Sequence, residues 1–586
     1  MYDRTATTSS EEHGRTLWLV TAIGAMFLLQ CWFYRPYFGI DDSIIFQVYG
    51  SNLAHGYGWV YHAGAEHVEG TTSFLYTLLW GLSFLTPWPQ LVMHLINLVC
   101  ALAAFWTALR ILQPLLGDVR YPRQIDVYLI VYLLWIALNP GALTWTTVAL
   151  MDMSLWAFLV VAAVYVTCRF ARDQDGAYYS KGMSLIGGIM VLTRPESLLL
   201  VPAMILLAAG ISLASGSTAR QALRIAAVPL TVFASLAVFL TLFRYFYFGY
   251  PFPNTYYAKV SPDRVYNIYI GLKYLSRFLR YCPLLLPLLA VAGFAALRAA
   301  SQWIRGGKQS TDHLVLLAAV LPVFVILFIP ILNGGDHFAQ GRFFTPVVLL
   351  VPLPCLRLLP SGIDWPTSRG AQKAVMLLWV GLIVLTGRER LIAPRQQEED
   401  LKGEFEIAEA GLQTGEILNR IFPGEAKPTV GVIAAGGIAL TYDGYVIDVL
   451  GLNNTLVAHS GGGRYGVKNH ASFSTQAFYR LSPDVFCVFQ VTPESLAASK
   501  LWDESPGFDD GTHHIRTEAA FRSSYEKVEL WFRDPAIGQP SSKLTGSGSA
   551  LDRLMRPRLK QTVALSTYIK RDVADRLDPR IVEVRR

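Results

Sequence analysis

Two acidic residues, Asp41 and Asp42, follow one another at the end of the first long apolar segment of the sequence. A carboxylate that lies beside a low-dielectric membrane interior, with a like charge next to it, has its pKa raised towards neutral pH. Such a carboxylate can accept a proton from a substrate hydroxyl and act as a general base. The alternative is purely structural: one of the two aspartates caps a helix over 43–54 and interacts favourably with its dipole.

The composition indicates that most of the chain surrounding this pair is membrane protein. The 586 residues are 53% hydrophobic and only 16% charged, whereas soluble domains carry roughly 25% charged residues. Residues 1–387 hold 25 Lys/Arg and 17 Asp/Glu, and residues 388–586 hold 25 and 26. We therefore predict a membrane domain followed by a soluble domain. The basic excess belongs to the membrane domain, which argues against nucleic acid as a partner.

Apolar runs long enough to cross a hydrocarbon core of about 30 Å predict about eleven transmembrane helices. They cover 17–33, 91–109, 126–139, 151–168, 183–193, 196–213, 224–247, 281–297, 313–332, 345–360 and 374–387. The shorter run 74–85 is interpreted as an amphipathic segment at the interface. The positive-inside rule then places the N-terminal tail 1–16 in the cytoplasm, and the loop 34–73 and the C-terminal domain outside. Without a cleavage-site pattern, 17–33 is predicted to be a retained first span.

One predicted outer loop, 248–280, departs from the positive-inside rule. It contains five basic residues: Lys259, Arg264, Lys273, Arg277 and Arg280. Basic residues are depleted from outer loops, so this cluster requires a reason, such as an anionic ligand.

The region 388–586 is predicted to be an α/β domain outside the cytoplasm. Residues 403–421 have the apolar spacing of a helix. Short strands are predicted at Thr429–Ala434, Tyr445–Val449, Val485–Val491 and Val528–Phe532.

Five motifs in order along the chain resemble a known family. They are Asp41-Asp42 followed by a Gly-rich stretch to Glu69-Gly70-Thr71-Thr72, Leu192-Thr-Arg194-Pro-Glu196, the run Tyr247 to Lys259, Gly334 to Arg342, and Val446 to Leu452. This pattern, over 17–455, resembles the GT-C glycosyltransferases, and within them the branch of mycobacterial terminal arabinofuranosyltransferases. The resemblance implies a multi-span enzyme that takes sugar from a polyprenyl-phosphate donor. Three positions differ from the family pattern: Gln47, Thr71 and Asp152.

The resemblance also implies a mechanism, in which Asp41, with Asp42 beside it, deprotonates the acceptor hydroxyl. Polyprenyl phosphate leaves, and fixed cations stabilise its developing charge. We expect Arg342, Lys259 and Arg194 to fulfil this role, and the alternative for each is a side chain that snorkels to the headgroups. The predicted topology places all five motifs on the outer face, which a lipid-phosphate donor requires.

Further polar residues are candidates for supporting roles in the same site. His337 is a candidate for hydrogen bonding to phosphate, and Asp336 for pairing with Arg342. The candidates for orienting substrate are Glu69, Asp152, Tyr256, Asn254 and Asp336. No spacing among the acidic residues demands a metal ion, and no C-x-x-C pattern occurs. We therefore predict neither a metal nor a prosthetic group.

The leading hypothesis is a glycosyltransferase of the bacterial cytoplasmic membrane that acts outward. Its donor sugar would be a pentose such as arabinofuranose, its acceptor an envelope glycan or a surface glycoprotein, and one displacement with one base would invert the anomeric centre. The alternative is a transporter or a lipid-linked sugar flippase. Transporters place ionisable residues near the membrane midplane, often in repeated halves. A third possibility is a polymer-binding domain with a membrane anchor, for which eleven spans are more than is needed.

Overall fold

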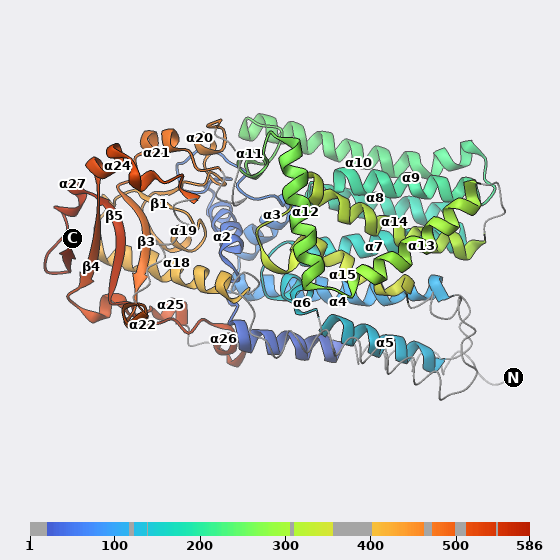
Figure 1. Cartoon of the computed structure of the whole chain (residues 1–586), viewed down its shortest axis with the longest axis horizontal. Helices are drawn as coiled ribbons and strands as arrows, with labels where there is room; N and C mark the ends of the chain where they lie inside the picture. Colours follow the sequence, from blue (N-terminus) through green and yellow to red (C-terminus); the bar gives the residue numbers. More distant parts are fainter. Residues whose placement is uncertain are drawn as a thin grey trace.

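The computed structural model describes residues 20–116, 122–137, 139–304, 310–355, 401–461, 472–498, 511–545 and 549–586. It consists of a helical bundle and a C-terminal region built on a β-sheet, which lies against one end of the bundle (Figure 1). The polar motifs of the sequence come together where the C-terminal region meets the bundle.

Six of the described helices are long and apolar enough to cross a membrane. They are α4 (Pro89–Leu116), α7 (Met153–Asp173), α9 (Ser197–Ala214), α10 (Ala219–Phe248), α13 (Leu285–Ile304) and α14 (Thr311–Leu332). Their length and composition indicate a membrane protein. Local sequence explains where they begin and end: α10, for example, starts at a capping box formed by Thr218 and Gln221 and ends at Gly249 in the left-handed conformation.

The remaining predicted spans correspond to helices that are shorter or less apolar, or they lie outside the described residues. An apolar helix covers Val20–Tyr34, α5 covers Pro122–Ala137, and α8 covers Gly176–Thr193. Near 345–360 the structure has α15 (Thr345–Leu350), and the predicted span 374–387 is outside the described residues. The count of eleven spans therefore stays a prediction. The run 74–85, interpreted as interfacial, contains the ten-residue helix α3 (Phe74–Ser83).

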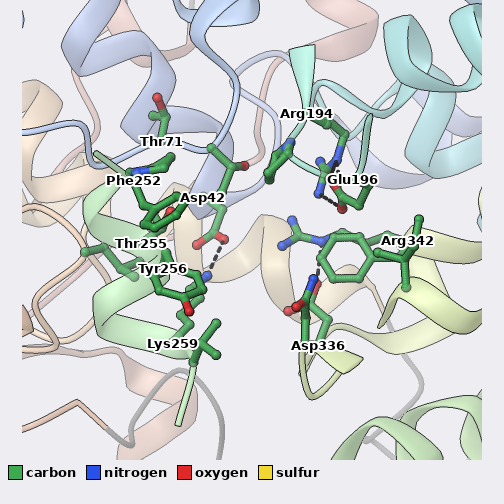
Figure 2. Close-up of a pocket in the computed structure, with 18 of the residues that line it drawn as sticks. Asp42, Thr71, Arg194, Glu196, Phe252, Thr255, Tyr256, Lys259, Asp336 and Arg342 are labelled. Carbon is green, nitrogen blue, oxygen red and sulfur yellow. Dashed lines mark hydrogen bonds and ion pairs between the residues drawn. The ribbon is translucent and has the colours of Figure 1, made fainter. Parts of the chain in front are cut away.

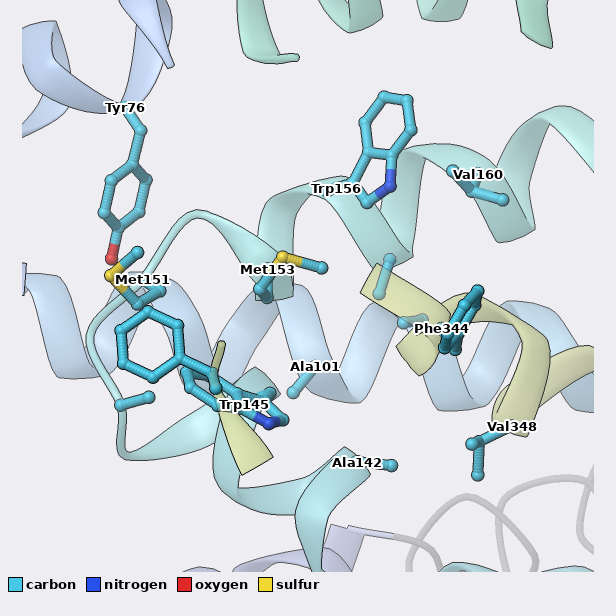
Figure 3. Close-up of a cluster of buried hydrophobic side chains, with 14 of the residues drawn as sticks. Tyr76, Ala101, Ala142, Trp145, Met151, Met153, Trp156, Val160, Phe344 and Val348 are labelled. Carbon is cyan, nitrogen blue, oxygen red and sulfur yellow. The ribbon is translucent and has the colours of Figure 1, made fainter. Parts of the chain in front are cut away.

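The bundle core lies around α7, which packs against α4, α8 and α14. Large side chains pack around α7 and the neighbouring helix α6 (Pro140–Thr147), among them Trp145, Met153, Trp156 and Phe344 (Figure 3). All four are almost fully buried. Close packing of this kind is rigid and fixes the loops above it.

The predicted helix after the acidic pair is α2 (Asp41–Ala54), and its N-cap is Ile40, which offers no side-chain cap. The capping part of the structural alternative is therefore wrong, but both aspartates lie in the first helical turn, where they interact favourably with the helix dipole. Gly39 precedes α2 with φ +73°, and a Cβ there would collide with Ser43 and with the carbonyl of Ala149. The chain can make this entry into α2 only with glycine.

The C-terminal region contains a six-stranded sheet in the order β2-β1-β3-β5-β4-β6. The strands are β1 (Val430–Val432), β2 (Val446–Asp448), β3 (Val485–Val491), β4 (Tyr525–Phe532), β5 (Ala564–Lys570) and β6 (Val582–Arg585). The β1 strand is parallel to both neighbours, and the other pairs are antiparallel. The structure has strands at all four places where the sequence predicts them. Helices α18 (Lys402–Ile421) and α19 (Gly437–Thr441) contact α2 and connect the sheet to the bundle.

The contact between α18 and α19 depends on glycine, and this generates a stability prediction. A Cβ at Gly437 would lie 2.6 Å from the amide nitrogen of Leu412 and 2.7 Å from the carbonyl oxygen of Ala408. Because both atoms are backbone of α18, the helices must move apart. We expect Gly437→Ala to reduce the free energy of unfolding by about 1–3 kcal/mol, measured as a lower melting temperature in detergent.

Gly403→Ala is the matched control, because Gly403 lies on α18 and a Cβ there meets no atom within 4 Å. Alanine should leave the melting temperature unchanged or raise it slightly. Equal melting temperatures for the two variants would contradict the proposed packing.

Candidate functional site

A cavity of about 410 Å³ lies where the bundle meets the C-terminal region (Figure 2). Each of the five sequence motifs contributes to its wall, through Asp42, Gly70, Arg194, Lys259, Arg342 and Leu452, among others. Residues separated by hundreds of positions therefore share one space. Its polar lining also includes Thr71, Thr72, Glu196, Thr255, Tyr256 and Asp336.

Asp42 is the member of the acidic pair that lines the cavity. Its carboxylate lies 3.9 Å from Nζ of Lys259, at the C-terminal end of α11 (Asn254–Lys259). This distance allows an ion pair but is too long for a hydrogen bond. Both side chains keep some exposure, at 19% and 15%. Asp42 is therefore held near a cation while its oxygens stay accessible to another proton donor.

Asp41 points away from the cavity lining and into the C-terminal region. Its two carboxylate oxygens accept hydrogen bonds from the backbone N–H groups of Gly436 and Gly437, each at 2.9 Å. Burial raises the pKa of Asp41 to about 6, although these two hydrogen bonds oppose the shift. The expectation that Asp41 is the base and Asp42 its support is thus not matched by the placement: Asp41 is committed to backbone amides.

Arg342 lies in the 3-10 segment η1 (Ala339–Phe344) and pairs with Asp336. Burial alone would raise the pKa of Asp336, but the guanidinium of Arg342, the hydrogen bond from His337 and the charge of Lys259 together outweigh it and hold that pKa well below its ordinary range. Arg342 is only 6% exposed, and its Nη1 has no hydrogen-bond partner in the described chain. Buried guanidinium N–H groups normally have partners, so the unpaired nitrogen marks a place for an acceptor in the cavity.

The loop that carries Asp336 and Arg342 is held by a residue that the sequence analysis assigned no specific role. Nη2 of Arg277 donates to the carbonyls of Asp336, His337 and Phe338 at 2.9–3.1 Å. The Arg342 guanidinium also lies 4.4 Å from the ring centroid of Phe338. These contacts fix the position of the cation before any ligand binds.

Arg194 lines the cavity but its charge is already compensated. Nη1 lies 2.8 Å from both carboxylate oxygens of Asp152, and Nη2 lies 2.9 Å from Glu196. Arg194 and Asp152 are both almost fully buried, so removal of either would leave an unpaired buried charge. Asp152 thus contacts Arg194 from behind the lining. Arg194 is a buried ion-pair residue here, and not a side chain that snorkels outward.

Three further candidates support the cavity from behind. Glu69 forms a buried ion pair with Arg244, with N–O distances of 2.7 and 2.9 Å. Arg244 lies within the predicted span 224–247. Asn254 donates to the carbonyls of Gly451 and Leu452 in the C-terminal region. His337 contacts Asp336 at 3.3 Å, and its pKa is lowered by burial. Of the orienting candidates, Tyr256 and Asp336 line the cavity.

The C-terminal region places another carboxylate, which no sequence motif indicated, near the acidic pair. Glu404, on α18, is close enough to Asp42, Asp41 and Asp336 that these charges add to the effect of burial, and its pKa is raised to about 8. At neutral pH Glu404 is therefore mostly protonated. Its place in a helix predicted from apolar spacing alone gave no signal that it lies near these carboxylates.

Among the described residues, no group of three or more His, Cys, Asp or Glu side chains is placed to hold a metal ion. The carboxylates of the cavity are instead engaged with Arg194, Lys259 and Arg342. A reaction without metal stays a prediction.

No family model and no curated protein matches this chain. Solved structures similar to it include the Archaeoglobus fulgidus oligosaccharyltransferase in its apo form, with 12% identity, a TM-score of 0.45, and coverage of 88% of this chain and 73% of that one. Another is ArnT from Cupriavidus metallidurans bound to undecaprenyl phosphate, with 12% identity, a TM-score of 0.43, and coverage of 83% and 95%. Similarity at this level does not define an activity.

The placement of Asp41 predicts a pH-dependent stability. Asp41 binds a proton more tightly in the folded state than in the unfolded chain. Its contribution to the free energy of unfolding is therefore fully present below about pH 4 and is lost as the pH rises through about 6. The loss should be on the order of 2–3 kcal/mol. We expect Asp41→Asn to flatten this part of the pH profile of the melting temperature, because asparagine does not titrate.

Asp443→Asn serves as the control, since Asp443 is exposed in the same region. Its profile should follow that of the unchanged protein between pH 4 and 6. A wild-type slope that persists in Asp41→Asn would assign the titration to another group.

Proposed function

We propose that this protein is a membrane glycosyltransferase that moves a sugar from a polyprenyl-phosphate donor to a hydroxyl acceptor. One observation carries the proposal: the Asp42 carboxylate and the Arg342 guanidinium, with its unpaired N–H, line the same cavity. Glycosyl transfer from a lipid phosphate needs a base for the acceptor and a cation for the leaving group.

Asp42 is the carboxylate of this cavity best suited to be the base. Glu196 and Asp336 also line the cavity, but each is engaged with an arginine. Their oxygens are thus occupied, and the pKa of Asp336 is held well below its ordinary range. Asp42 has only the longer contact with Lys259, so its oxygens can accept the proton of an incoming hydroxyl.

The apolar part of the lining supports a lipid-linked donor. Leu198 and Leu199 come from the first turns of α9, and Ile329 and Leu332 from the last turns of α14. Both helices are candidate membrane spans. A phosphate near Arg342 would therefore have hydrocarbon surface beside it for the attached polyprenyl chain.

The proposed reaction is a single displacement. Asp42 takes the proton of the acceptor hydroxyl as its oxygen forms a bond to the anomeric carbon, and the bond from that carbon to the phosphate oxygen breaks. Polyprenyl phosphate leaves with the bonding electrons, and Arg342 and Lys259 stabilise its charge. The proton on Asp42 then passes to solvent or to the departing phosphate. One displacement inverts the anomeric centre.

The finer assignments of the proposal come from the family that the sequence motifs resemble and from the predicted topology. They are a pentose such as arabinofuranose as donor sugar, an envelope glycan or surface glycoprotein as acceptor, and a position on the outer face of the cytoplasmic membrane. The C-terminal region would then lie outside the cytoplasm and form one wall of the active site through Leu452.

The proposed base predicts a specific loss of transfer. In membranes supplied with radiolabelled polyprenyl-phosphate arabinose, Asp42→Asn should lower the rate of transfer by about 10²–10⁴-fold. Asn keeps the shape of the side chain but cannot accept the proton. The measurement is label incorporated into envelope glycan, with expression checked by immunoblot.

Asp173→Asn is the control, because Asp173 is an exposed residue at the last turn of α7. It should transfer sugar at the normal rate. Undiminished transfer by Asp42→Asn would remove the proposed base. Movement of labelled lipid across vesicles without any new glycosidic bond would favour a flippase instead.

The proposed phosphate contact predicts a loss of donor binding for Arg342 variants. Arg342→Gln should weaken the binding of polyprenyl monophosphate, measured by native mass spectrometry, and lower kcat/KM for the donor by about 10²–10³-fold. Arg342→Lys keeps the charge but not the forked N–H groups, so we expect a partial defect. Equal donor binding in all three proteins would contradict the assignment.

A further inference from the structure

We infer that α12 (Arg264–Tyr281) lies along the membrane interface at the site end of the bundle and binds the headgroups of anionic phospholipids. The inference concerns lipid around the protein and does not rest on the proposed transfer reaction. It starts from the five basic residues in 248–280, which depart from the charge pattern of the other predicted outer loops.

The α12 helix crosses the ends of the membrane helices instead of running along them. In Figure 1 it runs from top to bottom of the view, whereas α10, α9, α14 and α4 run horizontally. Its contact with the last turn of α14 is close: a Cβ at Gly271 would collide with the backbone of Ile331. Since α14 is a candidate span, its end marks the level at which hydrocarbon gives way to headgroups.

The inner face of α12 is buried against the rest of the protein. The buried residues Asn267, Gly271, Tyr274 and Phe278 recur at helical spacing. Tyr274 and Phe278 stack on Phe344, with ring centroids 5.0 and 4.7 Å apart. This face therefore packs on the segment that carries Arg342. The opposite side of α12 must then face outward.

The outward face of α12 carries large apolar side chains. Val265 is 77% exposed, and Ile268, Tyr269 and Leu272 are 41–56% exposed. A helix with apolar residues on its free face and cationic residues beside them typically lies in the plane of a membrane interface.

The charges of the helix select the kind of lipid. Two of the five basic residues have partners within the protein, Lys259 at Asp42 and Arg277 at the loop carbonyls. The other three, Arg264, Lys273 and Arg280, are exposed and form no ion pair with another described residue. The stretch 254–281 has a single acidic residue, Asp263, which caps α12. Cations without an ion-pair partner on either side of exposed apolar side chains match an anionic headgroup on an acyl chain.

The test uses the full-length protein in nanodiscs made from a roughly four-to-one mixture of phosphatidylcholine and phosphatidylglycerol. A fluorophore is attached at Ile268→Cys after Cys100→Ala, since the other cysteines are buried. Brominated acyl chains, which quench it, are placed on one lipid species or the other. We expect quenching per mole of lipid to be at least about twofold stronger from phosphatidylglycerol.

The variant Arg264→Gln/Lys273→Gln/Arg280→Gln should lower that ratio to about one, whereas Arg264→Lys/Arg280→Lys should preserve it. A label at Leu206→Cys, which is 68% exposed on α9, should show no preference in either background. An equal effect of both lipids at Ile268→Cys in the unchanged background, or no quenching by either, would overturn the inference. No donor is present, so the outcome is independent of glycosyl transfer.

Discussion

The site depends on a contact between residues 395 positions apart in sequence, in which the buried Asp41 carboxylate accepts the amides of Gly436 and Gly437. Successive residues of an α-helix point about 100° apart. Once Asp41 is directed into the C-terminal region, its neighbour Asp42 must point elsewhere, and it points into the cavity. A Cβ at Gly436 would collide with the Asp41 carbonyl, so the close approach also requires glycine.

Electrostatic balance distinguishes the remaining residues of the cavity. A charge that is buried without a partner destabilises the fold. Arg194 avoids this cost because it forms ion pairs with both Asp152 and Glu196. Asp42 and Arg342 are less completely paired. The contact of Asp42 with Lys259 is 3.9 Å long, and Nη1 of Arg342 has no hydrogen-bond partner among the described residues. A protein tolerates such incomplete pairing where a ligand completes it.

Local patterns explain why some of this was predictable from sequence. A short apolar run rich in β-branched and aromatic residues marks Val485–Val491, and the strand has these bounds in the structure. The adjacency of Asp41 and Asp42 marked them as a functional pair. Their division of roles was not predictable, because the partners of Asp41 are backbone amides, which have no signature in the sequence. Arg244 was similarly hidden, since it lies within an apolar run and its partner Glu69 is 175 positions away in the sequence.

The C-terminal region lines the cavity with Leu452. It is also bound to α11, because Asn254 on that helix donates hydrogen bonds to the carbonyls of Gly451 and Leu452. Gly70, in the first motif, packs directly against Asn453 of the same turn. The two halves of the molecule are consequently not interchangeable modules. A chimera that replaces only the C-terminal third would need compatible residues in both of these distant loops, so the three segments are constrained to diverge together.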